Sequence, residues 1–255
     1  MGAIKRVVLG LDPSLTRTGY CVLGEVDGEK PFLFDIGTIE PPPWARIHLE
    51  TMIYVQERLD RLLSGALSVY AMTQCGEIKH VACEGAVFGG GDAVAQLYAL
   101  QMFAQRAFLE RRAKVVYLAP SAWRSVAHGW QDPGASSVRK RWKEDALQLC
   151  KAETGLKKLN SDMADAWAIA RTGLRFFAAL EGSATLTKSE EFIFKRIRVP
   201  NRGILKGSPV KEGLAFKKDR LWFDFGESVW ASPHSTRCTR RTSKEASSTS
   251  PTMST

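Results

Sequence analysis

Four carboxylate side chains in this sequence stand where metal-dependent chemistry could be built. Asp12 and Glu84 each end a short apolar run of the kind that forms a buried strand. Asp162 and Asp165 are three residues apart in an alanine-rich segment, so on a helix they share one face. Carboxylate oxygens are the hard ligands that Mg²⁺ and Mn²⁺ prefer. If the fold brings the four together, they form a site for divalent cations.

Such a site would suit the hydrolysis of a phosphodiester. Two divalent ions about 3.5–4 Å apart can activate a water molecule and stabilise the leaving oxygen of an in-line displacement. This chemistry needs neither a covalent intermediate nor a catalytic histidine. Without cations the clustered carboxylates would repel one another, and their pKa values would rise.

Each carboxylate also has a purely structural interpretation. Asp12 precedes Pro13, and Asp often starts a turn in this context. Asp162 could cap a helix, with Asp165 as the acidic residue three positions later in a capping box. The sequence alone leaves the structural and the chemical interpretations open.

The apolar pattern predicts the elements that must position these side chains. Short apolar runs predict five strands, and longer runs at helical spacing predict four helices. The predicted strands cover residues 7–12, 20–23, 30–39, 80–88 and 114–118. The predicted helices cover residues 44–67, 92–112, 138–150 and 162–180. Strands in a run, followed by strands alternating with helices, favour an α/β domain with a mixed five-stranded sheet flanked by helices.

Charged residues are distributed unevenly along the chain. The net charge is +9, and residues 182–255 hold 14 Lys and Arg against 7 Asp and Glu. We predict a folded domain over 1–181, a basic appendage containing aromatic residues over 182–230, and a Ser- and Thr-rich disordered tail over 231–255. Alternation over 191–199 indicates a strand in the appendage. The basic C-terminal extension suggests a polyanionic partner, with nucleic acid the first choice.

Composition narrows the class of protein. The hydrophobic fraction of 44% and the charged fraction of 25% are those of a globular protein. No apolar run approaches the roughly 18 residues that cross a bilayer, so we expect a soluble protein without a membrane partner. The five cysteines are scattered and form no CxxC pair, which argues against a disulfide framework or a zinc site. A reducing, cytoplasmic location is expected.

The order and spacing of the motifs resemble the RuvC family of Holliday-junction resolvases, which have the RNase H-like fold. The resemblance covers residues 4–177 and depends on Asp-Pro at 12–13, Thr-Gly-Tyr at 18–20, Glu84, and Asp-x-x-Asp at 162–165. It implies that the four carboxylates are catalytic and hold two Mg²⁺ ions, for which Mn²⁺ can substitute. It also implies a homodimer that binds four-way DNA junctions and nicks two opposing strands symmetrically during recombination or repair. No small-molecule substrate is expected.

The resemblance also implies roles for other residues. Lys143 matches a family lysine near the scissile phosphate, and Phe88 matches an aromatic residue that wedges against bases at the junction. An ordinary core position is an equally good interpretation of Phe88. Many family members have Gly where Ser14 stands. The basic residues that could contact DNA phosphates, or could belong to a solvated helix face, are Arg124, Arg139, Lys140, Arg141 and Lys143.

Other functions fit parts of the same pattern. A broader debranching nuclease or a transposase-type nuclease core would use the same carboxylates, although the sequence shows no separate DNA-reading module such as a zinc finger. An actin-like sugar kinase could use residues 12–19 as a phosphate loop, but such kinases need two lobes and a second loop of this kind. A non-catalytic DNA-binding module is a third alternative. Clustered carboxylates count against it, because they would repel phosphates without a bridging metal.

Overall fold

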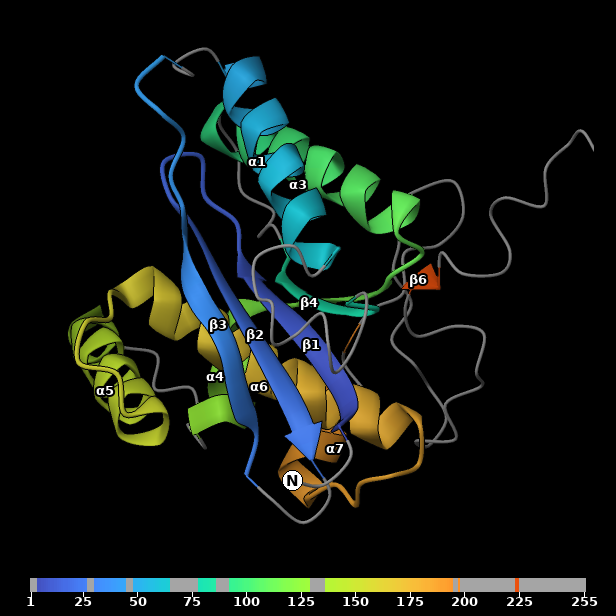
Figure 1. Cartoon of the computed structure of the whole chain (residues 1–255). Coiled ribbons are helices and arrows are strands. Elements are labelled where there is room, and N and C mark those ends of the chain that lie inside the picture. Colours follow the sequence, from blue (N-terminus) through green and yellow to red (C-terminus); the bar gives the residue numbers. More distant parts are fainter. Residues whose placement is uncertain are drawn as a thin grey trace, which may run out of the picture.

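The computed structural model shows a mixed sheet with helices on both faces (Figure 1). Among the residues that it describes, no helix is both long enough and apolar enough to cross a membrane. Side chains are not described for residues 48, 92–94, 136–142 and 223–224. The described residues are 4–26, 30–44, 48–64, 78–85, 92–128, 136–194, 197 and 223–224.

Within the described residues, five longer strands and one two-residue strand make up the sheet. The strands are β1 (Ile4–Asp12), β2 (Thr18–Val26), β3 (Phe32–Ile39), β4 (His80–Glu84), β5 (Lys114–Leu118) and β6 (Phe223–Asp224). Their order across the sheet is β3-β2-β1-β4-β5-β6. The pairs β1–β2, β2–β3 and β5–β6 are antiparallel, whereas β1–β4 and β4–β5 are parallel.

Helices cover the two faces of this sheet. The helices are α1 (His48–Leu63), α3 (Asp92–Glu110), α4 (Pro120–His128), α5 (Ser136–Thr154), α6 (Ser161–Leu180) and α7 (Lys188–Phe194). The helices α1 and α3 pack on one face, and α4 to α7 lie on the other (Figure 1). Covering both faces explains why β1 is buried along most of its length.

Alternate residues of each central strand enter different cores. On β1, Val8 packs with the α6 side, while Leu9 and Leu11 pack with the α1 and α3 side. On β4, Ala82 and Cys83 divide in the same way. This is the period of two that an extended backbone imposes. The end of each strand is therefore held from both faces, which fixes where the next side chain projects.

Helix α6 approaches the sheet unusually closely. A Cβ at Gly10 would overlap the backbone oxygen of Ala166, and a Cβ at Gly173 would lie 2.5 Å from the Cβ of Ala82. Glycine on one surface and alanine on the other remove the side-chain bulk that would keep the two apart. The start of α6 is thereby fixed over the same edge of the sheet at which β1 ends.

The structure confirms the predicted mixed α/β sheet and corrects details of the prediction. Helix α4 was missed because Pro120 suggested only a stop, whereas proline also suits the first turn of a helix. The strand predicted over 191–199 is wrong for residues 191–194, which belong to α7, with Phe194 fully buried in the core beside α6. The domain division at residue 181 and the disordered tail stay predictions, since residues 198–222 and 225–255 lie outside the described part of the chain.

Candidate active site

Asp12 and Glu84 lie side by side at the ends of two paired strands. The parallel register pairs Leu11 of β1 with Cys83 of β4, so the next residue on each strand is an acid. Both acids are partly buried, and their carboxyl groups lie within hydrogen-bonding reach of each other. Gln101 of α3 donates to the backbone oxygen of Glu84 at 2.8 Å, which ties this strand end to the opposite helical layer.

Burial and neighbouring acids raise the pKa values of both residues. Burial contributes most to the pKa of Asp12, which rises to about 8, followed by the hydrogen bond to Glu84 and the negative charges of Glu84 and Asp162. Burial also raises the pKa of Glu84, with a further contribution from Asp165. Arg124 opposes the rise in both cases. The pair therefore favours a state in which one proton is retained between the two carboxylates.

Asp162 and Asp165 come to the same place from the first turns of α6. The N-cap of this helix is Asn160, whose Oδ1 accepts a hydrogen bond from the backbone nitrogen of Met163 at 2.9 Å. The interpretation of Asp162 as the N-cap is therefore wrong. A Cβ at Gly19 would overlap the backbone oxygen of Asp162, so β2 supports the helix start directly.

Asp165 faces the strand-end acids. Burial is the main cause that raises the pKa of Asp165 to about 7, and the negative charges of Asp12 and Asp162 add to the rise. Asp162 has different partners, because its Oδ1 accepts from Ser161 Oγ at 3.1 Å and its Oδ2 accepts from Arg17 Nε. The fold thus brings together the four carboxylates that the sequence singled out, which we call the acid cluster: Asp12, Glu84, Asp162 and Asp165.

Two of the predicted basic residues act on the acid cluster. Arg124 on α4 lies over the indole ring of the buried Trp123, with its Cζ 4.7 Å from the ring centroid. Its charge lowers the pKa values of three of the acids, Asp12, Glu84 and Asp165. Lys143 on α5 is exposed, and its charge lowers the pKa values of Glu84 and Asp165. The acids therefore have cationic neighbours from two helices.

The remaining predicted contacts lie outside the described side chains. Phe88 belongs to the undescribed segment between β4 and α3. The backbone of α5 includes the other three basic residues, whose side chains are not described: Arg139, Lys140 and Arg141. Sequence reasoning missed Arg17, although its place in the turn directly after Asp12 was a usable signal. The partner of Arg17 could not be predicted, since Asp162 lies 145 residues further along the chain.

The acid cluster fits a divalent metal ion by donor type and by charge. Its donors are all carboxylate oxygens, which suit Mg²⁺ or Mn²⁺. Three of the acids are partly buried and have raised pKa values, so the nearby positive charge does not offset the cost of burying their negative charges. Within the described residues, however, no three His, Cys, Asp or Glu side chains stand ready to hold a metal ion. Metal binding therefore requires the carboxylate side chains to rotate. The metal ion must also displace the proton shared by Asp12 and Glu84 and the contact of Arg17 with Asp162.

The turn between β1 and β2 makes a poor phosphate loop. The backbone nitrogen of Ser14 donates to Thr18 Oγ1 at 3.2 Å, and that of Thr16 donates to Ser14 Oγ at 3.4 Å. A phosphate loop instead needs backbone N–H groups that point outward at the anion. The internal hydrogen bonds of this turn disfavour the kinase interpretation.

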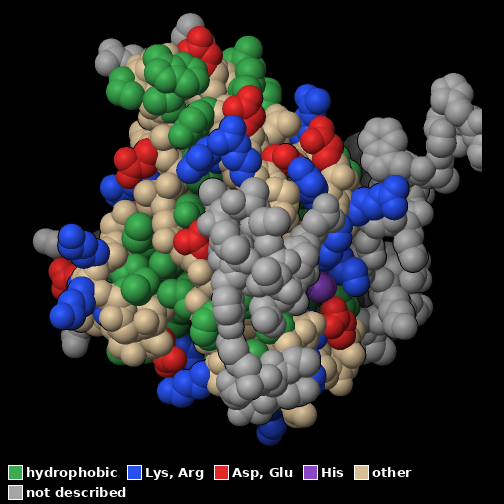
Figure 2. Space-filling view, viewed as in Figure 1, with side chains coloured by type: hydrophobic (Ala, Val, Ile, Leu, Met, Phe, Trp, Pro, Cys, Tyr) green, Lys and Arg blue, Asp and Glu red, His purple; other side chains and the backbone are tan. Residues whose placement is uncertain are grey.

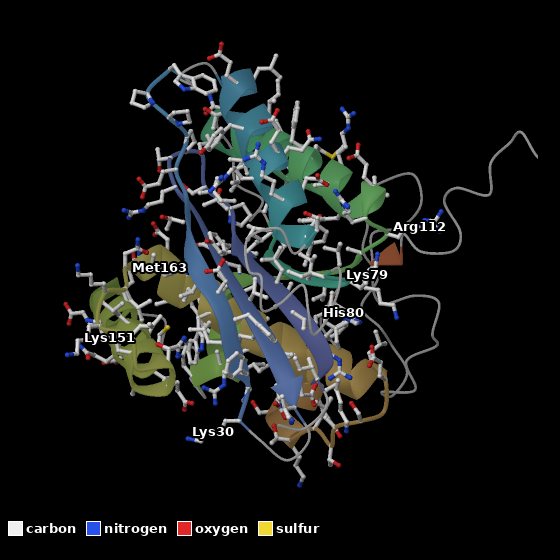
Figure 3. All side chains as sticks on the ribbon, in the orientation of Figure 1. Lys30, Lys79, His80, Arg112, Lys151 and Met163 are labelled. Atoms are coloured by element: carbon white, nitrogen blue, oxygen red, sulfur yellow. The ribbon has the colours of Figure 1, made fainter. Side chains whose placement is uncertain are left out.

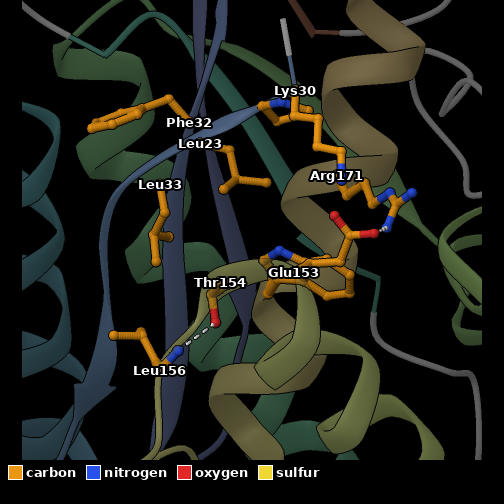
Figure 4. Close-up of a pocket in the computed structure, with 10 residues that line it drawn as sticks. Leu23, Lys30, Phe32, Leu33, Glu153, Thr154, Leu156 and Arg171 are labelled. Atoms are coloured by element: carbon orange, nitrogen blue, oxygen red, sulfur yellow. Dashed lines mark hydrogen bonds and ion pairs between the residues drawn. The ribbon is translucent and has the colours of Figure 1, made fainter.

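A cavity that no member of the acid cluster lines is shown in Figure 4. This cavity of about 530 Å³ opens between the β2–β3 hairpin and the helices α5 and α6. Arg171 lies over the ring of Trp167 at 5.3 Å and within 3.8 Å of Glu153. Arg171 is thus engaged by the protein itself, and the acid cluster is the better candidate for chemistry.

Known structures share the fold of this chain, although no protein-family model and no curated protein sequence matches it. RuvC of T. thermophilus in complex with a Holliday junction substrate matches with a TM-score of 0.51 and 21% identity, over 70% of this chain and 98% of that chain. A second Thermus thermophilus RuvC structure matches with a TM-score of 0.51 and 22% identity over the same shares. Fowlpox virus resolvase in complex with Holliday junction DNA has a TM-score of 0.44 and 15% identity, over 68% of this chain and 98% of that chain.

The two Thermus structures establish the fold class. The chain has the RNase H-like fold of RuvC, and the fold predicted from the sequence motifs is confirmed. At this level of identity the likeness concerns the fold, and function must be argued from the site.

Proposed function

We propose that this protein is a metal-dependent, structure-selective endonuclease that resolves four-way DNA junctions. The observation that carries the proposal is the acid cluster, in which side chains from β1, β4 and α6 converge at one edge of the sheet. A structural role would not need three partly buried acids with raised pKa values, because such groups lower stability.

In this proposal the acid cluster holds the cations and the basic residues hold the substrate. Asp12, Glu84, Asp162 and Asp165 would hold Mg²⁺ or Mn²⁺, which supplies an activated water and stabilises the leaving oxygen. Lys143 is exposed beside Glu84 and Asp165, where it can contact the scissile phosphate. Arg124 reduces the negative potential that would otherwise keep a phosphodiester away.

The RuvC likeness supports DNA junctions as the substrate. The matched Thermus protein is in complex with a Holliday junction substrate, and this chain spans 98% of that chain. Net charge supports the same choice, since a chain of +9 favours a polyanionic partner. We extend the proposal to DNA recombination or repair in the cytoplasm.

Symmetrical paired nicks require two active sites, which a homodimer supplies. Exposed apolar side chains on the α1 and α3 layer are candidates for the contact with a second copy, and Figure 2 shows hydrophobic side chains gathered over the start of α1. Trp44 is 68% exposed, Leu49 on α1 is 55% exposed, and Met102 on α3 is 63% exposed. Large apolar groups in water favour association when they form one patch. We propose these three side chains as part of the dimer surface.

The test uses a labelled synthetic four-way junction and a linear duplex of matched sequence, each incubated with the protein with and without Mg²⁺. Paired symmetrical nicks on the junction alone, lost on addition of EDTA, are the expected result. Cutting of flaps and three-way forks as well would change the proposal to a broader debranching nuclease. Tight binding without cutting would indicate a non-catalytic module. ATP turnover without binding or cutting would favour the kinase.

A further inference from the structure

Arg17 forms a direct ion pair with one member of the acid cluster. Its Nε donates to Oδ2 of Asp162, while Ser161 Oγ donates to Oδ1 of the same carboxylate at 3.1 Å. Both oxygens of Asp162 are therefore engaged within the protein. The Arg17 side chain is 42% exposed and that of Asp162 is 23% exposed, so the pair lies at the mouth of the site.

The contact is well defined by the fold around it. The turn that carries Arg17 is closed by the Thr18 hydroxyl, which donates to the backbone oxygen of Ser14 at 2.9 Å. The next residue, Gly19, lies against the backbone of Asp162 so closely that a Cβ there would overlap it. Because both the turn and the helix start are fixed, the fold itself places Arg17 beside Asp162.

Arg17 differs in kind from the other cations of the site. Arg124 and Lys143 act on several acids through their charge. Arg17 instead engages one carboxylate oxygen that a metal ligand must offer to the ion. A guanidinium and a divalent cation cannot occupy the same oxygen lone pairs, so their binding to Asp162 is competitive.

We propose that Arg17 is a positioning residue that competes with the divalent cation for Asp162 and, once displaced, binds a backbone phosphate of the DNA. The proposal rests on the proposed function, because it takes Asp162 as a metal ligand. An exposed arginine can rotate toward a phosphate, to which its planar guanidinium binds through two parallel hydrogen bonds. Metal binding would then free Arg17 for DNA, and DNA binding would free Asp162 for the metal.

Such competition makes metal binding and DNA binding favour each other. By linkage, the factor by which DNA tightens metal binding equals the factor by which metal tightens DNA binding. Removing Arg17 removes the competitor and the coupling together. A partly exposed ion pair of this kind corresponds to about twofold to fivefold in metal affinity.

The first experiment measures Mn²⁺ binding to the full-length protein without DNA, by calorimetry or by the loss of the free-ion spin-resonance signal. The variants are Arg17→Gln, Arg17→Lys and the charge-matched control Arg61→Gln, which removes an exposed cation in the last turn of α1, on the opposite face of the sheet. Arg17→Gln should bind Mn²⁺ about twofold to fivefold more tightly than wild type. Arg17→Lys should lie between, and Arg61→Gln should match wild type. Equal or weaker binding by Arg17→Gln overturns the proposal.

The second experiment measures the coupling. Four-way junction binding is followed by fluorescence anisotropy in EDTA and in Ca²⁺, an ion offered in place of Mg²⁺ to limit cleavage. Ca²⁺ should tighten junction binding by the wild type and by Arg61→Gln, and should tighten binding by Arg17→Gln several-fold less. An equal gain in all three proteins overturns the phosphate role.

The two proposals fail in different ways. If the wild type cuts the junction but Arg17→Gln binds Mn²⁺ as the wild type does, only the role of Arg17 is wrong. If Arg17→Gln binds Mn²⁺ more tightly but no junction is cut, the competition stands and the nuclease proposal fails. Absence of Mn²⁺ binding to the wild type overturns both. Unchanged circular dichroism and melting temperature confirm that each variant is folded.

Discussion

Acidic side chains are paired with cations at the C-terminal end of α6 but outnumber the cations at its N-terminal end. At the C-terminal end the Arg6 side chain, only 2% exposed, donates to Glu25, to Glu181 at 2.6 Å and to Ser183 at 3.1 Å. His80 lies 3.2 Å from the other oxygen of Glu181. Burial alone would raise the pKa of Glu181, but the hydrogen bond and charge of Arg6 hold it below its usual value.

At the N-terminal end the acids outnumber the cations in contact with them. Figure 3 labels Met163, in the first turn of α6, and His80 on β4, which contacts Glu181 just beyond the C-terminal end of the helix. Near Met163, the pKa of Asp12 rises to about 8 and that of Asp165 to about 7. A charge network built only for stability pairs its members, as the Arg6 end does. We interpret the surplus of acids at the other end as a place prepared for a cation that the chain itself does not supply.

The largest expected effect concerns activity at the acid cluster. Asp165→Asn keeps the shape of the side chain but removes a negative metal ligand. Junction cleavage should fall on the order of 10³-fold or more, while junction binding persists. Gel assays of cleavage and anisotropy measurements of binding check this result. Cleavage at the wild-type rate would remove Asp165 from the metal site and break the contrast between the two ends.

A large effect on stability is expected at the opposite end. Arg6→Met leaves Glu25 and Glu181 without their shared cation, which should lower the free energy of unfolding by about 2–3 kcal/mol, since the two glutamates keep partial contact with water. Urea denaturation measures the change. Cleavage per folded molecule should stay at the wild-type level. If cleavage by the folded fraction fell as it does for Asp165→Asn, the two ends would not be functionally distinct.

A third prediction concerns the packing that holds the acid cluster in place. Gly10→Ala forces a Cβ against the backbone oxygen of Ala166, and a backbone atom cannot rotate away. We expect a loss of about 1–3 kcal/mol in unfolding free energy, together with reduced cleavage because the start of α6 shifts. In Gly173→Ala the nearest atom is the Cβ of Ala82, so Ala82→Gly should partly restore stability there. Ala170→Gly should not rescue Gly10→Ala, and a full rescue would contradict the backbone clash.

The smallest expected effect is a pH dependence of stability in EDTA. Asp12 and Asp165 keep protons in the folded chain that the unfolded chain releases above about pH 4. Because the folded chain binds more protons at these two groups, their contribution to the free energy of unfolding falls as pH rises from about 4 to 8. His80 and His128, whose pKa values burial lowers to about 4, contribute in the opposite direction below about pH 6.5, and they are common to the two proteins compared. We expect the free energy of unfolding of the wild type to fall relative to that of Asp12→Asn by at least about 1 kcal/mol between pH 5 and pH 8, and parallel pH profiles of the two proteins would contradict the raised pKa values.

The parts of the site that depend on local pattern could be predicted from the sequence. An apolar run ending in an acid identified Asp12 and Glu84, and spacing placed Asp162 and Asp165 on one helix face. Helix α4 was missed because a proline after a strand indicates a stop as well as a helix start.

Contacts between distant segments could not be predicted. The ion pair between Arg17 and Asp162 depends on the close approach of α6 to Gly19, which the sequence does not encode as a local signal. The same holds for Arg6, which follows Lys5 at the start of β1 and whose partners lie on β2 and just beyond α6. Both arginines could be noticed in the sequence, but only the fold shows which acids they meet.

The most direct test of the central claim is anomalous X-ray diffraction from crystals of the protein soaked in Mn²⁺. The account predicts an anomalous peak within bonding distance of Asp12 and of at least two other members of the acid cluster, with the guanidinium of Arg17 moved away from Asp162. No peak should occur at the Arg6 end of α6. A cluster without a peak at saturating Mn²⁺, or a peak only among Glu25, Glu181 and His80, would contradict the account.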